Sequence, residues 1–136
     1  MTTTTTTTRA TPAIRVLCAV DAVLLAISGI IHLRLWFQAY RHVPTLDILF
    51  LLQVIAAFVL AIALIVVRHR LVVAAALALV LGTIAGYFLA LTVGIFGFKD
   101  PGATGESNLV LAVEIAAVIL LAITGWLMVR PAGRSA

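Results

Sequence analysis

The chain has 136 residues, of which 64% are hydrophobic and only 10% are charged, and its mean hydropathy is +1.25. Soluble domains are about half apolar and a quarter charged, and a small domain in water leaves much of its surface exposed. The composition therefore excludes a water-soluble domain and predicts an integral membrane protein with lipid as its main solvent.

The net charge of +4 comes from eight arginines and one lysine that are scattered in ones and twos between apolar runs. Since there is no basic patch, we expect no nucleic-acid partner.

The richness in Arg, Ala, Val and Leu is typical of bacteria with GC-rich genomes, and we expect the protein in the plasma (inner) membrane of a bacterium. Cys18 is the single cysteine, which excludes an intramolecular disulfide or a C-x-x-C pair.

The N-terminal segment, residues 1–11, contains seven consecutive threonines and has no apolar periodicity, which predicts a disordered tail. Thr11 is a candidate N-cap, and Pro12 suits the first helical position. An apolar run then extends from about residue 14 to 33. A signal peptide is the alternative for this run, but its length and the lack of an A-x-A-like cleavage site favour a transmembrane helix.

Three more apolar runs follow, separated by polar or Pro- and Gly-containing segments. They cover residues 46–67, 71–93 and 108–129. All four prolines lie at or beyond the ends of the runs, as helices require. The fold predicted for residues 12–130 is therefore all-α, a single integral membrane four-helix bundle, with a short tail at 131–136.

The orientation follows from the distribution of basic residues, because Lys and Arg are retained on the cytoplasmic side. One side carries Arg9, Arg15, Arg68, Arg70, Arg130 and Arg134, and the other carries Arg34, Arg41 and Lys99. Six residues against three predict that the N and C termini are both cytoplasmic. The loops at 32–45 and 99–107 would then face the exterior.

The third run contains small residues at every fourth position, Ala78, Gly82, Gly86 and Ala90. Such spacing places small side chains along one face of a helix and lets two helix backbones approach closely. We expect this stripe to serve helix packing, either within the bundle or between two copies in a homo-oligomer.

Polar side chains within the runs indicate where a function would lie, because each is costly in hydrocarbon unless it is paired or faces water. At about 1.5 Å per residue, one polar group from each helix falls at a similar depth, roughly 9 Å below the outer surface. This layer contains Ser28, Gln53, Tyr87 and Glu114, with His32 and Arg34 one turn above at the mouth.

We predict that this layer forms an outer-leaflet ligand pocket. Glu114 is its main candidate, as a proton acceptor, ligand anchor or cation ligand, with His32 or Arg34 as a possible partner. The alternative is a structural network of hydrogen bonds that keeps the four helices in register. Asp21, nearer the cytoplasmic end, is expected to pair with Arg15, Arg68 or Arg130.

The histidines do not predict a haem, because no two of them lie mid-span on different helices. His32, His42, Asp47 and Glu106 could meet outside the membrane around a divalent ion, but interfacial residues are the favoured interpretation, and no metal site is predicted. No motif of soluble-type enzyme chemistry is present. We therefore lean away from an enzyme.

The end of the first run, residues 28–33 with the sequence SGIIHL, resembles the small-Gly-apolar-His pattern that ends the first helix of DoxX-like four-helix bacterial membrane proteins. Size and predicted topology are similar as well. The resemblance implies a link to quinone-linked oxidation or to a membrane oxidoreductase complex. The chain lacks the cysteine pair that direct thiol chemistry would need.

Two functions remain open. The first is a small membrane binding or accessory subunit that holds a lipophilic ligand, a quinone or a lipid, in the outer pocket. The second is a small oligomeric transporter or channel in which Glu114 lies on an ion or proton path. The first is favoured because one carboxylate and few other polar residues would line a continuous pore poorly.

Overall fold

The computed structural model describes residues 11–102 and 104–130. The predicted tail at residues 1–11, apart from Thr11, and the tail at 131–136 lie outside the described residues. The described part contains four long helices and no strand. The elements are α1 (Pro12–Leu35), the π-helical turn η1 (Trp36–Tyr40), α2 (Leu46–Val66), α3 (Arg70–Thr92) and α4 (Gly105–Val129).

All four helices are long and apolar enough to cross a membrane, which confirms the predicted four-helix, multi-pass architecture. The shortest, α2, has 21 residues and measures about 31 Å at 1.5 Å per residue, close to the thickness of the hydrocarbon core. The predicted boundaries agree with the structure to within three residues, except at the end of the first helix.

Local capping explains where two of the helices begin. The hydroxyl of Thr11 accepts a hydrogen bond from the backbone N–H of Ile14 at 3.4 Å, so the predicted N-cap is confirmed. Thr104 and Ser107 form a reciprocal capping box at the start of α4. This box starts the helix three residues before the predicted position, because it satisfies N–H groups that a loop would leave unpaired.

The first helix does not end at residue 33 as predicted but continues through η1 to Tyr40. In η1 the N–H of Arg41 donates to the carbonyl oxygen of Trp36 at 2.9 Å, an i to i+5 hydrogen bond. The polar and aromatic residues that predicted a loop here form one wider helical turn instead. This turn lies at the end of the bundle where α1 is followed by α2.

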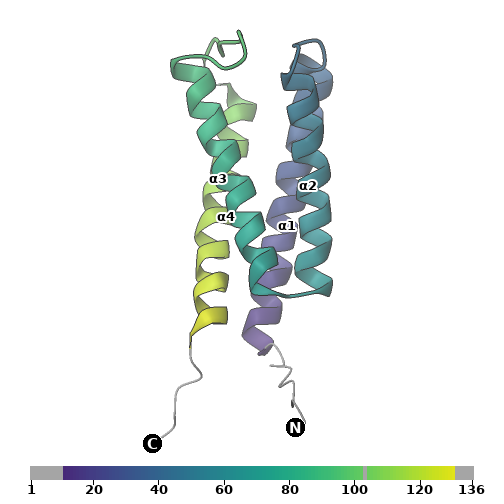
Figure 1. The fold of residues 1–136 in the computed structure, drawn as a ribbon, viewed down its shortest axis with the longest axis vertical. Helices are drawn as coiled ribbons and strands as arrows, with labels where there is room; N and C mark the ends of the chain where they lie inside the picture. The colour runs from purple at the N-terminus through teal and green to yellow at the C-terminus, as the bar shows by residue number, and fades with distance from the viewer. Residues whose placement is uncertain (1–10, 103, 131–136) are drawn as a thin grey trace, which may run out of the picture.

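The helices alternate in direction, so α1 begins and α4 ends at the same end of the bundle (Figure 1). We call this the turn end, because residues 67–69 form a short turn there between α2 and α3. The opposite end, with the connections 41–45 and 93–104, is the loop end. Close together at the turn end, α2 and α3 separate towards the loop end (Figure 1).

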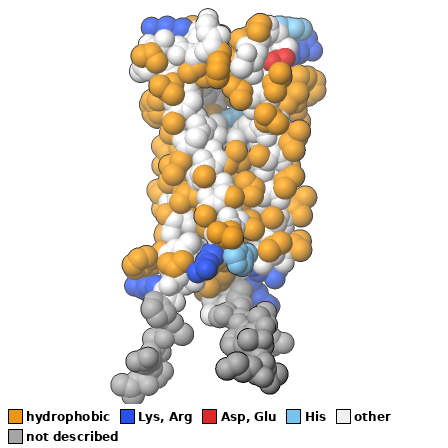
Figure 2. Space-filling model, viewed as in Figure 1, with side chains coloured by type: hydrophobic (Ala, Val, Ile, Leu, Met, Phe, Trp, Pro, Cys, Tyr) orange, Lys and Arg blue, Asp and Glu red, His pale blue; other side chains and the backbone are white. Residues whose placement is uncertain are grey.

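The apolar core fills the turn-end half of the bundle. Its fully buried residues come from all four helices and include Leu25, Leu64, Val80, Ala117 and Leu121. Large hydrophobic side chains also cover the outer surface, as expected for helices that face lipid (Figure 2). The loop-end half contains a cavity between the helices, and the candidate site lies there.

Close packing of α1 against α2 depends on Gly29. A Cβ atom at this position would lie 3.3 Å from Ala57 Cβ and 3.3 Å from Phe58 Cε2. We expect Gly29→Leu to lower the free energy of unfolding by about 1–3 kcal/mol, the usual cost of overpacking. Denaturation in mixed micelles followed by circular dichroism measures this. Gly82→Leu is the control, because a Cβ there meets nothing within 4 Å; equal stability of the two variants would contradict this packing.

Candidate ligand-binding site

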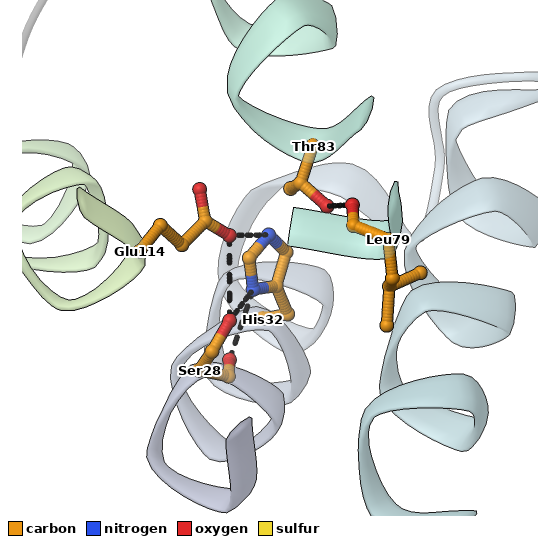
Figure 3. Close-up of polar contacts among 5 residues, drawn as sticks. All are labelled: Ser28, His32, Leu79, Thr83 and Glu114. Atoms are coloured by element: carbon orange, nitrogen blue, oxygen red, sulfur yellow. Dashed lines mark hydrogen bonds and ion pairs between the residues drawn. The ribbon is translucent and has the colours of Figure 1, made fainter. Parts of the chain in front are cut away.

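Three buried polar side chains meet where α1 packs against α4 (Figure 3). The Ser28 hydroxyl donates a hydrogen bond to Glu114 Oε1 at 3.3 Å. His32, one turn further along α1, places Nε2 3.7 Å from the same oxygen. The three residues are at most 5% exposed. They join the two helices through one carboxylate oxygen.

The orientation of the His32 ring is set by its own helix. Its Nδ1 lies 2.9 Å from the backbone carbonyl oxygen of Ser28. A carbonyl oxygen can only accept, so Nδ1 carries a hydrogen and donates it. The Nε2 atom therefore faces Glu114, either as an acceptor beside a protonated carboxyl or as part of a charged imidazolium beside a carboxylate. Both arrangements leave the pair itself without net charge, which apolar surroundings favour, whereas a carboxylate beside a neutral imidazole needs a further cation to balance it.

The second carboxylate oxygen of Glu114, Oε2, points away from Ser28 and His32 (Figure 3). Within the described part of the chain, no hydrogen bond reaches this atom. A carboxylate has about four acceptor positions. Glu114 therefore retains unused accepting capacity on the side away from α1.

A cavity of about 810 Å³ occupies the loop-end half of the bundle, and Glu114 and His32 are among its lining residues. This volume is within the range of small-molecule and cofactor sites, about 300–1,000 Å³. Most of the lining is apolar and comes from α2, α3 and α4. Aromatic rings of Tyr40, Phe50 and Phe98 form part of the wall.

At the loop end of the cavity lies an aromatic cluster around Tyr40. Its ring stacks on Phe50 with centroids 4.2 Å apart and meets Phe98 edge-on. The Tyr40 hydroxyl donates to Asp100 Oδ2 at 2.9 Å, which ties η1 to the connection between α3 and α4. The π-helical turn thus places Tyr40 at the cavity.

The side of the cavity between α2 and α3 is open. Its lining includes Leu52, which is 55% exposed, and the exposed Gly82. In the same region, Figure 2 shows a hollow in the loop-end half of the surface. Because the neighbouring side chains are apolar and exposed, this opening faces the part of the membrane where lipid chains lie.

The stripe of small residues on α3 lines the cavity, and its two glycines do not pack against another helix of the chain. Ala78, Gly82, Gly86 and Ala90 all line the cavity. A Cβ atom at Gly82 or Gly86 would meet nothing within 4 Å. The prediction of close packing within the bundle is therefore wrong at the two glycines, because α3 leans away from α2 there. Contact with a second copy stays a prediction.

The other predicted site residues divide into two groups. Gln53 and Tyr87 line the cavity, and Gln53 Nε2 is buried without a hydrogen-bond partner among the described residues. Arg34 does not line the cavity: it is exposed and contacts the lining residue Glu106 at 3.4 Å. Two residues along a helix point to different faces, and His32 takes the inward one, so the place of Arg34 at the mouth stays a prediction.

Sequence reasoning missed Thr83, Phe50, Phe98 and Asp100 as lining residues. Thr83 donates its hydroxyl hydrogen to the Leu79 carbonyl oxygen at 2.8 Å. Its position four residues before Tyr87, on the same face of the helix, was the available signal. The two phenylalanines carried no signal, since aromatic residues in an apolar run are usually packing residues or lipid contacts.

Asp21 forms a second polar contact between α1 and α4, deep in the turn-end half. Its Oδ2 lies 2.6 Å from the Thr124 hydroxyl, and its Oδ1 has no partner among the described residues. The predicted pairing with arginine is wrong within the described chain, where no salt bridge involves Asp21. Arg15 is six residues away, or about 240° around the helix, and points elsewhere.

The described residues also contain no group of three or more potential metal ligands. The alternative cluster of His32, His42, Asp47 and Glu106 does not form, because His32 is buried inside the bundle.

No family model, no curated protein and no solved structure matches the chain. Ser28 and His32, which carry the DoxX-like pattern, are the two α1 residues that contact Glu114.

Proposed function

We propose that this protein is a membrane-embedded binding or accessory subunit that holds a lipophilic ligand, a quinone or a lipid, in the loop-end cavity. The observation that carries the proposal is the cavity itself: about 810 Å³, with a buried carboxyl at one wall and a side opening between lipid-facing helices. An apolar pocket with a few convergent polar groups is the usual form of a ligand site.

The opening between α2 and α3 supports a ligand that arrives from the membrane. A water-soluble ligand would enter from the loop end, where the polar lining residues Gln38, Thr104 and Glu106 lie beside the aromatic cluster of Tyr40, Phe50 and Phe98. A lipophilic ligand can pass sideways along Leu52 and Gly82 without leaving the hydrocarbon. Its polar group would then reach the Glu114 wall while its tail remains in the opening.

The distribution of basic residues supports placing the loop end in the outer leaflet. Among the described residues, Arg15, Arg68, Arg70 and Arg130 flank the turn end, and basic residues are retained in the cytoplasm. The DoxX-like pattern supports a role beside a membrane oxidoreductase complex in the inner membrane of a bacterium. A homo-oligomer or a larger complex is part of this proposal.

A channel or transporter that uses Glu114 is supported less well by the packing. Between Glu114 and the turn end lie Leu25, Leu64 and Leu121, each 0% exposed. Conduction needs a continuous polar or hydrated lining. An ion at Glu114 would therefore meet a packed apolar core between that residue and the turn end.

Native mass spectrometry of the protein in native nanodiscs tests the proposal. We expect one lipophilic molecule to remain bound per chain after mild activation, because the site encloses it on most sides. We expect Glu114→Ala to lower its occupancy by about tenfold, the loss for one hydrogen bond to a charged group. If neither a lipophile nor a partner protein accompanies the wild-type chain, the proposed function is wrong.

A further inference from the structure

The geometry points to a lipophilic amine as the ligand: a primary ammonium group held at Glu114, with its apolar tail in the opening between α2 and α3. This inference rests on the proposed function and narrows its ligand from a quinone or a lipid with any head group to amphiphiles with a positively charged, hydrogen-donating head group. A quinone and an anionic lipid are both outside this class.

The charges around the cavity are the first argument. Its ionisable lining residues of Asp or Glu type are Asp100, Glu106 and Glu114, and the cavity lining includes His32 but no lysine or arginine. Arg34 contacts Glu106 on the exposed surface, while no arginine or lysine of the described chain lies within 4 Å of Glu114. Phosphate and carboxylate head groups are normally bound by arginine or lysine. This lining is complementary to a cation.

The use of hydrogen-bond donors is the second argument. The Ser28 hydroxyl already donates to Glu114, and His32 Nδ1 donates to a backbone carbonyl. Thr83 donates to the Leu79 carbonyl, and Tyr40 donates to Asp100. Along the contact between α1 and α4 the free capacity is accepting, at Glu114 Oε2, whereas Gln53 Nε2 on α2 is a buried donor without a partner among the described residues. A head group that brings N–H donors therefore fits the Glu114 wall.

The aromatic lining is the third argument. Tyr40, Phe50, Tyr87 and Phe98 all border the cavity. A cation over the face of an aromatic ring gains about 0.5–2 kcal/mol, and most when water is excluded. A neutral or anionic head group lacks this attraction. Aromatic rings and a buried carboxyl therefore favour the same kind of ligand.

Binding of three probes with the same twelve-carbon tail tests the inference: dodecylamine, dodecanol and dodecanoate. The protein is placed in phosphatidylcholine nanodiscs at pH 7, and the signal of empty nanodiscs is subtracted to remove partition into lipid. We expect the amine to bind at least about tenfold more tightly than the other two, the difference between a charge-assisted and a neutral hydrogen bond.

Two variants separate the role of Glu114 from that of other carboxylates at the same end of the bundle. Glu114→Gln should remove the preference for the amine over dodecanol, since the amide keeps the size of the carboxylate but not its charge. Asp47→Asn is the matched control and should keep the preference, because Asp47 is a carboxylate in the first turn of α2, at the same end of the bundle, that does not line the cavity.

The outcomes distinguish the inference from the proposed function. Equal binding of the three probes, tighter binding of dodecanoate, or an unchanged preference in Glu114→Gln would overturn the inference and leave a lipophile site in place. If the wild-type protein binds none of the probes and carries no lipophile of its own, both the inference and the proposed function are overturned.

Discussion

Phenylalanine at both Gly82 and Gly86 is expected to lower binding of the lipophilic ligand by at least tenfold while the bundle remains folded. The two glycines lie one turn apart on α3, and both line the cavity. Steric overlap between the new side chains and the ligand produces this loss if it weakens the binding free energy by more than about 1.4 kcal/mol. Native mass spectrometry gives the occupancy, and denaturation in mixed micelles gives the stability.

The fold should tolerate these substitutions because a Cβ at either glycine meets nothing within 4 Å. Glycine within a helix also costs about 0.5–1 kcal/mol relative to alanine, so its replacement can add stability. The matched control places phenylalanine at Leu81 and Ala85, which are exposed neighbours on the same two turns. If both double variants keep the ligand, it does not occupy this cavity.

The fold was largely predictable from the sequence because hydrocarbon imposes a simple rule. Each span needs about 20 apolar residues, and four such runs separated by polar or Pro- and Gly-containing segments are visible without any structure. The end of α1 was missed since Trp36 and Tyr40 have the composition of an interface loop. A π-helical turn leaves no such signature, because it depends on the packing of Tyr40 against Phe50 and Phe98.

The candidate site was predictable in part. Helical rise places Ser28 and Glu114 at one depth, and the structure brings them into contact. Depth alone does not give direction around the helix axis, however, so it did not show that His32 lines the cavity while Arg34 contacts Glu106 at the exposed surface. The cavity itself was hidden for a different reason: Gly82 and Gly86 have the spacing of a packing stripe, and only the tilt of α3 decides whether a helix or a cavity lies beside them.

Thr124→Val is expected to lower the free energy of unfolding by about 2–3 kcal/mol, through the loss of a buried hydrogen bond in apolar surroundings. Thr124 Oγ1 lies 2.6 Å from Asp21 Oδ2 and 2.9 Å from the carbonyl oxygen of Leu120. Without the hydroxyl, the carboxyl of Asp21, which is 0% exposed, has no partner in the described chain. Denaturation in mixed micelles measures the change.

The same geometry predicts the protonation state of Asp21. A threonine hydroxyl has one hydrogen, so its two contacts are both hydrogen bonds only if a protonated Asp21 donates to Thr124 while Thr124 donates to Leu120. Asp21→Asn can donate in the same way and should stay within about 1 kcal/mol of the wild-type stability. Asp21→Leu combined with Thr124→Val should recover most of the loss, since no polar group is then left unpaired. Destabilisation by Asp21→Asn as large as that by Thr124→Val would show instead that this contact needs a charged carboxylate.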